Sequence, residues 1–157
     1  MYYLDVRQGF KASVPRKIIS AMQHVPMMVP VVIICHRQHF FCSLEKFGSP
    51  STVGERILGS VIAPEGSGKT ARLLSASQRV KDSLLYYTLE YTVQSSAFFR
   101  HNVSVYVAYD DNLFSLNAQT PERVWPKVEK SFIMMAHSFV VVQNVGGAPK
   151  QDVPKML

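Results

Sequence analysis

Leu85-Tyr86-Tyr87-Thr88-Leu89-Glu90-Tyr91-Thr92-Val93 is the stretch of sequence that decides the fold. Its odd-numbered residues are leucine, tyrosine, leucine, tyrosine and valine. Its even-numbered residues, continued by Gln94, are mostly polar. A period of two places successive side chains on opposite faces of an extended chain and is typical of a half-buried β-strand. We therefore predict a strand here with one face in the core.

Three more strands are expected around this one, at residues 71–80, 103–109 and 113–118. The connections are short: residues 81–83 separate the first two strands, and Asp110-Asp111-Asn112 separates the last two. A parallel crossover needs a dozen or more residues, so these neighbours must be antiparallel. The sequence therefore predicts an antiparallel meander with an apolar face that needs a cover.

Helices are predicted on both sides of the meander. Ser49-Pro50 favours a helix start, with serine as the N-cap and proline in the first turn, and Gly59 is the expected stop. A second helix is expected to begin at residues 120–122, with Pro126 either kinking it or starting its regular part. Its apolar stripe recurs at helical spacing over Val124, Val128, Phe132, Met135 and Phe139.

Composition limits the class of protein. The chain has 157 residues, 47% of them hydrophobic, and a net charge of +6. This composition suits one folded domain, and the excess charge is not gathered on one element as nucleic-acid binders require. The longest apolar run, residues 25–35, is far shorter than the about 20 residues of a membrane span. No targeting peptide is visible, two cysteines are too few for a disulfide framework, and we expect a monomer.

The chain divides near residue 42. Residues 1–42 form an atypical N-terminal segment, with a weak edge-strand pattern at 9–15 and a β-branched run at 31–34 that suits a buried strand. Residues 43–142 form the clearly patterned domain. Residues 143–157 are polar and proline-containing and are expected to be a flexible tail.

One segment imitates a phosphate-binding loop. Residues 63–70 read Ala-Pro-Glu-Gly-Ser-Gly-Lys-Thr, so Gly68, Lys69 and Thr70 match the end of a relaxed P-loop pattern. A true P-loop follows a parallel strand and opens a helix, whereas hairpins are expected here. Nucleotide binding is nevertheless kept as the alternative function. Its test is whether the protein binds ATP or GTP and whether Lys69→Ala abolishes that binding.

Two further groups offer metal ligands. Cys35, His36, His39 and Cys42 gather soft ligands within eight residues, but structural zinc sites draw on two separated pairs. Asp110 and Asp111 offer oxygens at a hairpin tip, about half of what calcium needs. A partly buried core strand and ordinary turn chemistry are the preferred explanations of these two groups.

Several segments together resemble the PsbP-domain family. Residues 43–50 are similar to the entry of a helix in that family, and residues 85–93 to its central strand. Arg100-His101 also matches, and residues 113–119 followed by Pro121-Glu122 and Trp125 match most specifically. The helix that closes at residues 138–141 fits as well. The resemblance covers about residues 43–142, in the family's order.

The resemblance implies an α+β fold in which helices sandwich the antiparallel sheet. It also implies a non-enzymatic extrinsic protein of the chloroplast thylakoid lumen that associates with photosystem II or another thylakoid complex. Some members of the family help to retain calcium and chloride at the oxygen-evolving complex and others assist assembly, so the resemblance suggests calcium while the residues themselves establish no cofactor. A binding module of the same fold with a non-photosynthetic partner is a further alternative.

Candidate partner-binding residues are Arg100, His101, Arg123 and Trp125. Exposed aromatic rings beside arginines would make a suitable protein contact. The competing interpretation, which we favour, is that helices cover both faces of the sheet and bury tyrosines such as Tyr86 and Tyr106.

Overall fold

The computed structural model describes residues 12–13, 31–37, 44–109 and 112–141. Its centre is an antiparallel meander of four strands: β3 (Lys69–Lys81), β4 (Leu84–Ser95), β5 (Phe99–Tyr109) and β6 (Asn112–Pro121). The predicted meander is confirmed. The strands run beyond the predicted bounds because their polar ends pair without any alternation of apolar residues, as Lys69 does with Ser95.

The segment before residue 43 adds to this sheet. Strand β2 (Val31–Arg37) pairs antiparallel with β6, giving the order β2-β6-β5-β4-β3. This confirms the strand expected at residues 31–34. From the strand expected at 9–15, β1 (Ala12–Ser13) pairs with β7 (Val140–Val141), while the remainder lies outside the described residues. The boundary at residue 42 and the tail from residue 143 stay predictions.

The first helical region covers the β3–β4 half of one sheet face. A 3-10 turn, η1 (Leu44–Phe47), precedes helix α2 (Pro50–Ile57). The predicted cap is confirmed, because the backbone N–H of Thr52 donates to Ser49 Oγ at 3.2 Å. The predicted stop at Gly59 is wrong. The chain continues as a π-helical turn, η2 (Leu58–Ile62), because Leu58 and Ile62 pack against the sheet and stabilise the helical conformation.

The second helical region covers the other face over β5 and β6. After the 3-10 turn η3 (Glu122–Val124) comes α3 (Trp125–Ser138). Helical structure begins at Glu122, the last residue of the start expected at 120–122, while Thr120 and Pro121 still pair with β5. Pro126 lies in the first turn of α3, where its missing N–H costs nothing. The predicted apolar stripe is confirmed, since Val128, Phe132, Met135 and Phe139 are buried.

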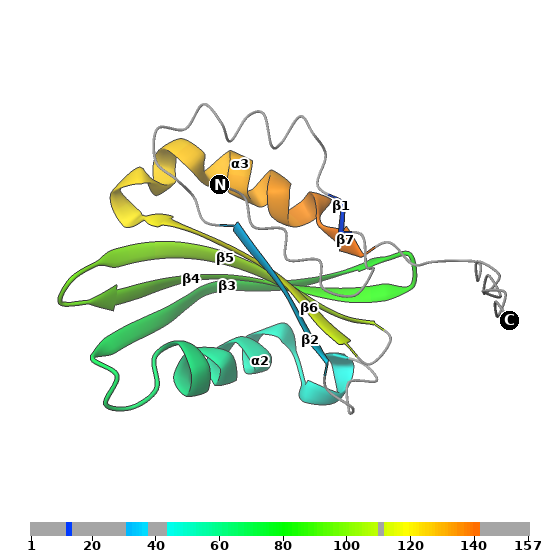
Figure 1. Ribbon diagram of the computed structural model, residues 1–157, viewed down its shortest axis with the longest axis horizontal. Coiled ribbons are helices and arrows are strands. Elements are labelled where there is room, and N and C mark those ends of the chain that lie inside the picture. The colour runs from blue at the N-terminus through cyan, green and yellow to red at the C-terminus, as the bar shows by residue number, and fades with distance from the viewer. Residues whose placement is uncertain (1–11, 14–30, 38–43, 110–111, 142–157) are drawn as a thin grey trace, which may run out of the picture.

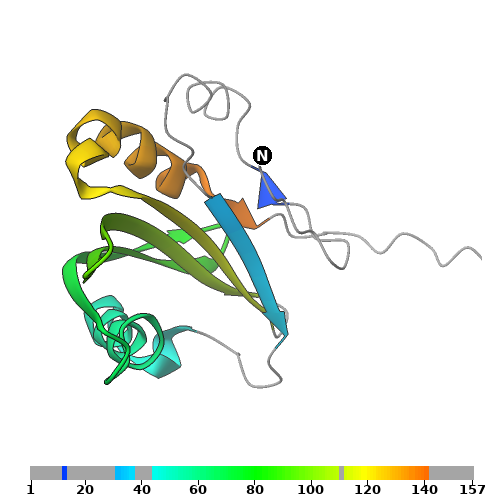
Figure 2. The ribbon, with the colours of Figure 1, turned by 60° about the vertical axis from the view of Figure 1, so that its left-hand side comes forward.

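The two helices therefore cover opposite faces of one twisted sheet, with α3 above it and α2 below it in Figure 1, and the layers are seen from the side in Figure 2. This α+β sandwich confirms the expected fold class. The largest apolar cluster lies under α3 and includes Tyr86, Val105, Leu116 and Phe132. Smaller clusters around Leu89 and Tyr87 lie under α2 and η1. In the described part of the chain no helix is long and apolar enough to cross a membrane.

The covered faces decide between the two interpretations of the aromatic residues. Tyr86 is fully buried, Tyr106 is half-buried and Trp125 is 8% exposed. Helices on both faces, as we favoured, account for these positions, and the idea of an exposed aromatic surface built on Tyr86 and Trp125 is wrong.

The hairpin between β3 and β4 turns through Asp82 and Ser83, with φ angles of 50° and 61°. Two successive left-handed residues are typical of a type I′ turn, which strongly prefers asparagine followed by glycine. A non-glycine residue in the left-handed region costs free energy that glycine avoids.

We expect Ser83→Gly to raise the free energy of unfolding by about 1 kcal/mol, because glycine adopts the left-handed region without the Cβ penalty. Urea denaturation followed by circular dichroism would measure the change. The control is Ser77→Gly within β3, which should destabilise by about 0.5–1 kcal/mol. Equal effects at both positions would contradict the assigned turn.

Candidate functional site

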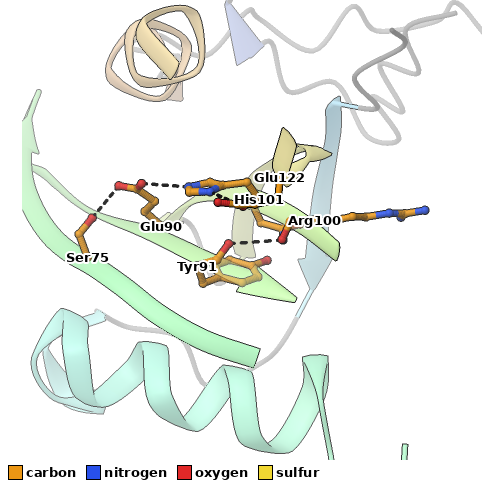
Figure 3. A network of polar contacts seen from close by, with 7 residues as sticks. Ser75, Glu90, Tyr91, Arg100, His101 and Glu122 are labelled. Atoms are coloured by element: carbon orange, nitrogen blue, oxygen red, sulfur yellow. Dashed lines mark hydrogen bonds and ion pairs between the residues drawn. The ribbon is translucent and has the colours of Figure 1, made fainter. Parts of the chain in front are cut away.

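His101 lies on β5 between two carboxylates from other elements. Its Nε2 is 2.9 Å from Glu90 Oε1 on β4, and its Nδ1 is 2.9 Å from Glu122 Oε2 on η3. The histidine is 2% exposed. Ser75 Oγ on β3 donates to the second oxygen of Glu90 at 3.1 Å, which extends the row to the edge of the sheet (Figure 3). Four elements are thus joined by one polar row, which we call the His101 clamp.

Trp125 closes the His101 clamp from α3. The imidazole and indole rings are stacked, with centroids 3.6 Å apart and planes 7° apart. Trp125 also meets Phe132 edge-on at 5.5 Å, and Phe132 belongs to the core under α3. The first turn of α3 is therefore held to the sheet by the histidine ring.

Cations gather at the end of the sheet next to the His101 clamp. Here β3 begins, β5 begins, and β6 passes into η3 and α3, as the strand pairing requires. We define the basic end by four residues with exposed side chains, Lys69, Arg100, Arg123 and Lys127. Glu122 belongs to the same end but is engaged by His101, and Glu65 precedes Lys69 in the adjoining loop. The basic end therefore carries a positive excess.

Arg100 has a defined position in the basic end. Its Nη1 donates to Gln119 Oε1 at 3.1 Å, and its guanidinium lies 4.6 Å from the centroid of the Phe98 ring. The neighbouring Phe99 is 45% exposed. A guanidinium fixed by an amide and an aromatic ring loses little side-chain freedom on binding, which suits a contact with a carboxylate.

A second polar row lies inside the opposite face of the sheet. The hydroxyls of Tyr91 and Ser104 are 3.1 Å apart, and Ser104 donates to Asn117 Oδ1 at 2.8 Å. Burial raises the pKa of Tyr91, and burial with the neighbouring Tyr91 raises the pKa of Tyr106 to about 12. Both tyrosines therefore remain protonated at neutral pH and supply no general base.

Residues 63–70 do not form the P-loop on which the nucleotide-binding interpretation rested. Gly68 ends a loop, and Lys69 and Thr70 begin the long strand β3, which pairs antiparallel with β4. A P-loop needs a helix after its lysine, so that backbone N–H groups and the helix dipole face the phosphates. A strand at this position provides neither.

The candidate metal ligands fall mostly outside the described residues, as Asp110, Asp111, His39 and Cys42 do. Cys35 and His36 lie on β2, whose backbone alone is described. Across the described part of the chain, no group of three or more His, Cys, Asp or Glu residues is arranged to hold a metal ion. The metal assignments stay predictions.

Of the predicted partner-binding residues, the structure brings all four together but gives them two roles. Arg100 and Arg123 have exposed side chains, so their contact with a partner stays a prediction. His101 and Trp125 are buried and hold the surface from within. Sequence reasoning missed Glu90 as their partner. The sequence signal for this contact is a carboxylate in the middle of a strand, on the face of the sheet that α3 covers.

Three comparisons with known proteins bear on this arrangement. The PsbP family model matches residues 3–141. The protein CyanoP of Thermosynechococcus vestitus is 32% identical over 154 residues, which cover 88% of this chain and 84% of that protein. PsbP domain-containing protein 7, chloroplastic, of Arabidopsis thaliana is 41% identical over 106 residues, which cover 64% of this chain but 37% of that protein.

Solved structures agree with the fold. The solution structure of CyanoP from Synechocystis sp. PCC 6803 has a TM-score of 0.63 and 27% identity, covering 73% of this chain and 68% of that chain. The crystal structure of PA94 from Pseudomonas aeruginosa has a TM-score of 0.56 at 12% identity, covering 90% of this chain and 89% of that chain, and shows the fold alone.

Proposed function

Because the chain belongs to the PsbP family, we propose that it is a non-enzymatic extrinsic protein of the thylakoid lumen that docks on photosystem II through its basic end. The single observation that carries the docking surface is the pair of exposed arginines, Arg100 and Arg123, which the strand pairing of Arg100 with Pro121 brings to the same end of the sheet.

The basic end suits an acidic protein surface. Fixed guanidinium groups recognise carboxylates bidentately, and a cluster of like charges accelerates encounter with an oppositely charged surface. Phe99 adds an exposed apolar contact beside Arg100. Binding of this kind weakens as salt screens the charges.

We expect the double variant Arg100→Glu/Arg123→Glu to bind stripped photosystem II membranes about tenfold or more weakly than the wild type, since both charges reverse within the proposed contact. Sedimentation of the membranes with labelled protein, at low and high salt, measures the affinity. The effect should shrink at high salt.

The matched control is Lys46→Glu/Arg56→Glu, which makes the same charge change on exposed residues of η1 and α2, across the sheet. An equal loss in both double variants would leave only a net-charge effect and reject the basic end as the docking surface. Capture of non-photosynthetic proteins instead of photosystem II subunits from solubilised thylakoids would reject the proposed partner.

The finer role we propose is support of the oxygen-evolving complex, by retention of calcium and chloride or during its assembly. Retention requires only that the docked protein slows the escape of ions. Oxygen evolution by stripped membranes at low calcium should recover when the wild type is added, and recover less with Arg100→Glu/Arg123→Glu. Recovery that is equal with both proteins would contradict this role.

A further inference from the structure

We propose that the His101 clamp works only with a doubly protonated ring, so that loss of one ring proton releases the η3 turn and weakens docking of the basic end. This inference rests on the proposed function for its docking consequence, while the protonation and release of the clamp stand on the structure alone.

Hydrogen-bond chemistry sets the charge of the ring. An ionised carboxylate only accepts hydrogen bonds, and a neutral imidazole donates from one nitrogen only. Both nitrogens of His101 lie 2.9 Å from carboxylate oxygens. With two ionised partners, both contacts are favourable only for the imidazolium, and a neutral ring turns one lone pair toward a negative oxygen.

The charged groups near the ring lie on β3, β4, β5 and η3. Glu90 of β4 and Glu122 of η3 face it directly, while α3 contributes the uncharged Trp125. Arg72 of β3 stands two strands away in the same row, opposite Thr92. Arg100 follows on the other face of β5, engaged by Gln119 and Phe98.

The two carboxylates are not held equally. Glu90 has a second contact, from Ser75, and its side chain is 23% exposed. Glu122 belongs to a three-residue turn, and its side chain is 32% exposed. When the ring becomes neutral, Glu122 is therefore the partner that leaves for solvent.

Release of Glu122 acts on the proposed docking surface. Arg123 is the next residue and Lys127 lies one turn further along α3, so both move with the η3 turn. The clamp is closed while the ring carries two protons and opens as pH rises and one of them is lost. Docking is therefore expected to weaken toward alkaline pH.

The chain carries its own reporter of this step. Trp125 is the sole tryptophan, and its ring is stacked on His101. A protonated imidazole in van der Waals contact quenches indole emission by accepting an electron from the excited state, and a neutral imidazole does so much less. Tryptophan fluorescence should therefore rise in one step as pH increases.

The first experiment is a pH titration of tryptophan fluorescence in the wild type, with imidazole ¹⁵N spectra to follow both ring nitrogens. We expect both nitrogens of His101 to be protonated at neutral pH. His101→Phe should abolish the step, and His137→Phe, a change of the exposed histidine of α3, should preserve it. A neutral ring at neutral pH, or a step that survives in His101→Phe, overturns the clamp.

Near-isosteric variants keep the test valid if His101→Phe does not fold. Glu90→Gln and Glu122→Gln each remove one negative partner, so the fluorescence midpoint should move to lower pH. Glu129→Gln, on the exposed face of α3, should leave the midpoint in place. Midpoints that do not move in either clamp variant contradict the proposal.

Docking on photosystem II membranes is then measured on both sides of the midpoint. The clamp predicts an affinity about tenfold weaker above the midpoint than below it. A normal fluorescence step without any docking would remove the proposed function and leave the protonation switch standing. Docking that is unchanged across a normal step would remove the proposed coupling between the clamp and the basic end.

Discussion

His101→Ala should lower the free energy of unfolding by about 2–4 kcal/mol. The change removes the shared partner of Glu90 and Glu122, whose side chains are 23% and 32% exposed. Two partly buried carboxylates then lose their hydrogen-bond partner. It also removes the ring stacked on Trp125 and leaves a void at the first turn of α3.

Urea denaturation at neutral pH, followed by circular dichroism, measures this loss. His101→Phe separates its two sources, since phenylalanine keeps a flat ring against Trp125 and removes both hydrogen bonds. It should recover part of the lost stability. His137→Ala, on the exposed side of α3, should change the stability by less than about 0.5 kcal/mol. A loss in His101→Ala as small as in this control would show that solvent alone satisfies the two carboxylates.

Arg79→Met should cost about 2–4 kcal/mol, because Arg79 fastens the end of α3 to the β3–β4 hairpin. Its Nη2 donates to the carbonyl oxygens of Ala136, at 3.4 Å, and Phe139. Its guanidinium also lies 4.2 Å from the centroid of the Tyr86 ring. A cation at the carboxyl end of a helix interacts favourably with the helix dipole as well.

Methionine keeps most of the aliphatic stem, so the substitution tests the guanidinium. Amide hydrogen exchange should accelerate most at Val141, whose N–H donates to the hydroxyl of Tyr86 beneath Arg79. Arg72→Met is the matched control, because Arg72 lies exposed on the same strand, and should change stability by less than about 0.5 kcal/mol. Uniform acceleration of exchange across the sheet would contradict a local role at the end of α3.

Much of the fold follows from local patterns. The alternation at residues 85–93 defines β4 and its two faces, and the short connections on either side of it require antiparallel neighbours. The helix cap at Ser49 and the stripe of α3 are also local signals. The errors lie at element ends: Gly59 did not stop a helix whose next residues pack on the sheet, and Thr120 stayed in β6 because its strand partner was in place.

The candidate site depended on information that local patterns do not contain. Sequence reasoning assigned Arg100, His101, Arg123 and Trp125 to one surface, and the structure brings them together. It could not separate the buried pair from the exposed pair, because burial depends on which half of the sheet each helix covers. Alternation alone gives His101 and Arg100 opposite faces without saying which face is covered.

The sequence by itself determined the antiparallel meander, the helices on its faces and the class of the fold. Apolar residues recur with a period of two in strands and 3.6 in helices, and these periods can be recognised within one short segment. Only the tertiary structure decided that His101 meets carboxylates 11 and 21 residues away, and that Arg79 reaches carbonyls 57 and 60 residues away. Those contacts depend on strand register and on where α3 crosses the sheet. Each is set by the packing of the whole core and by no segment alone.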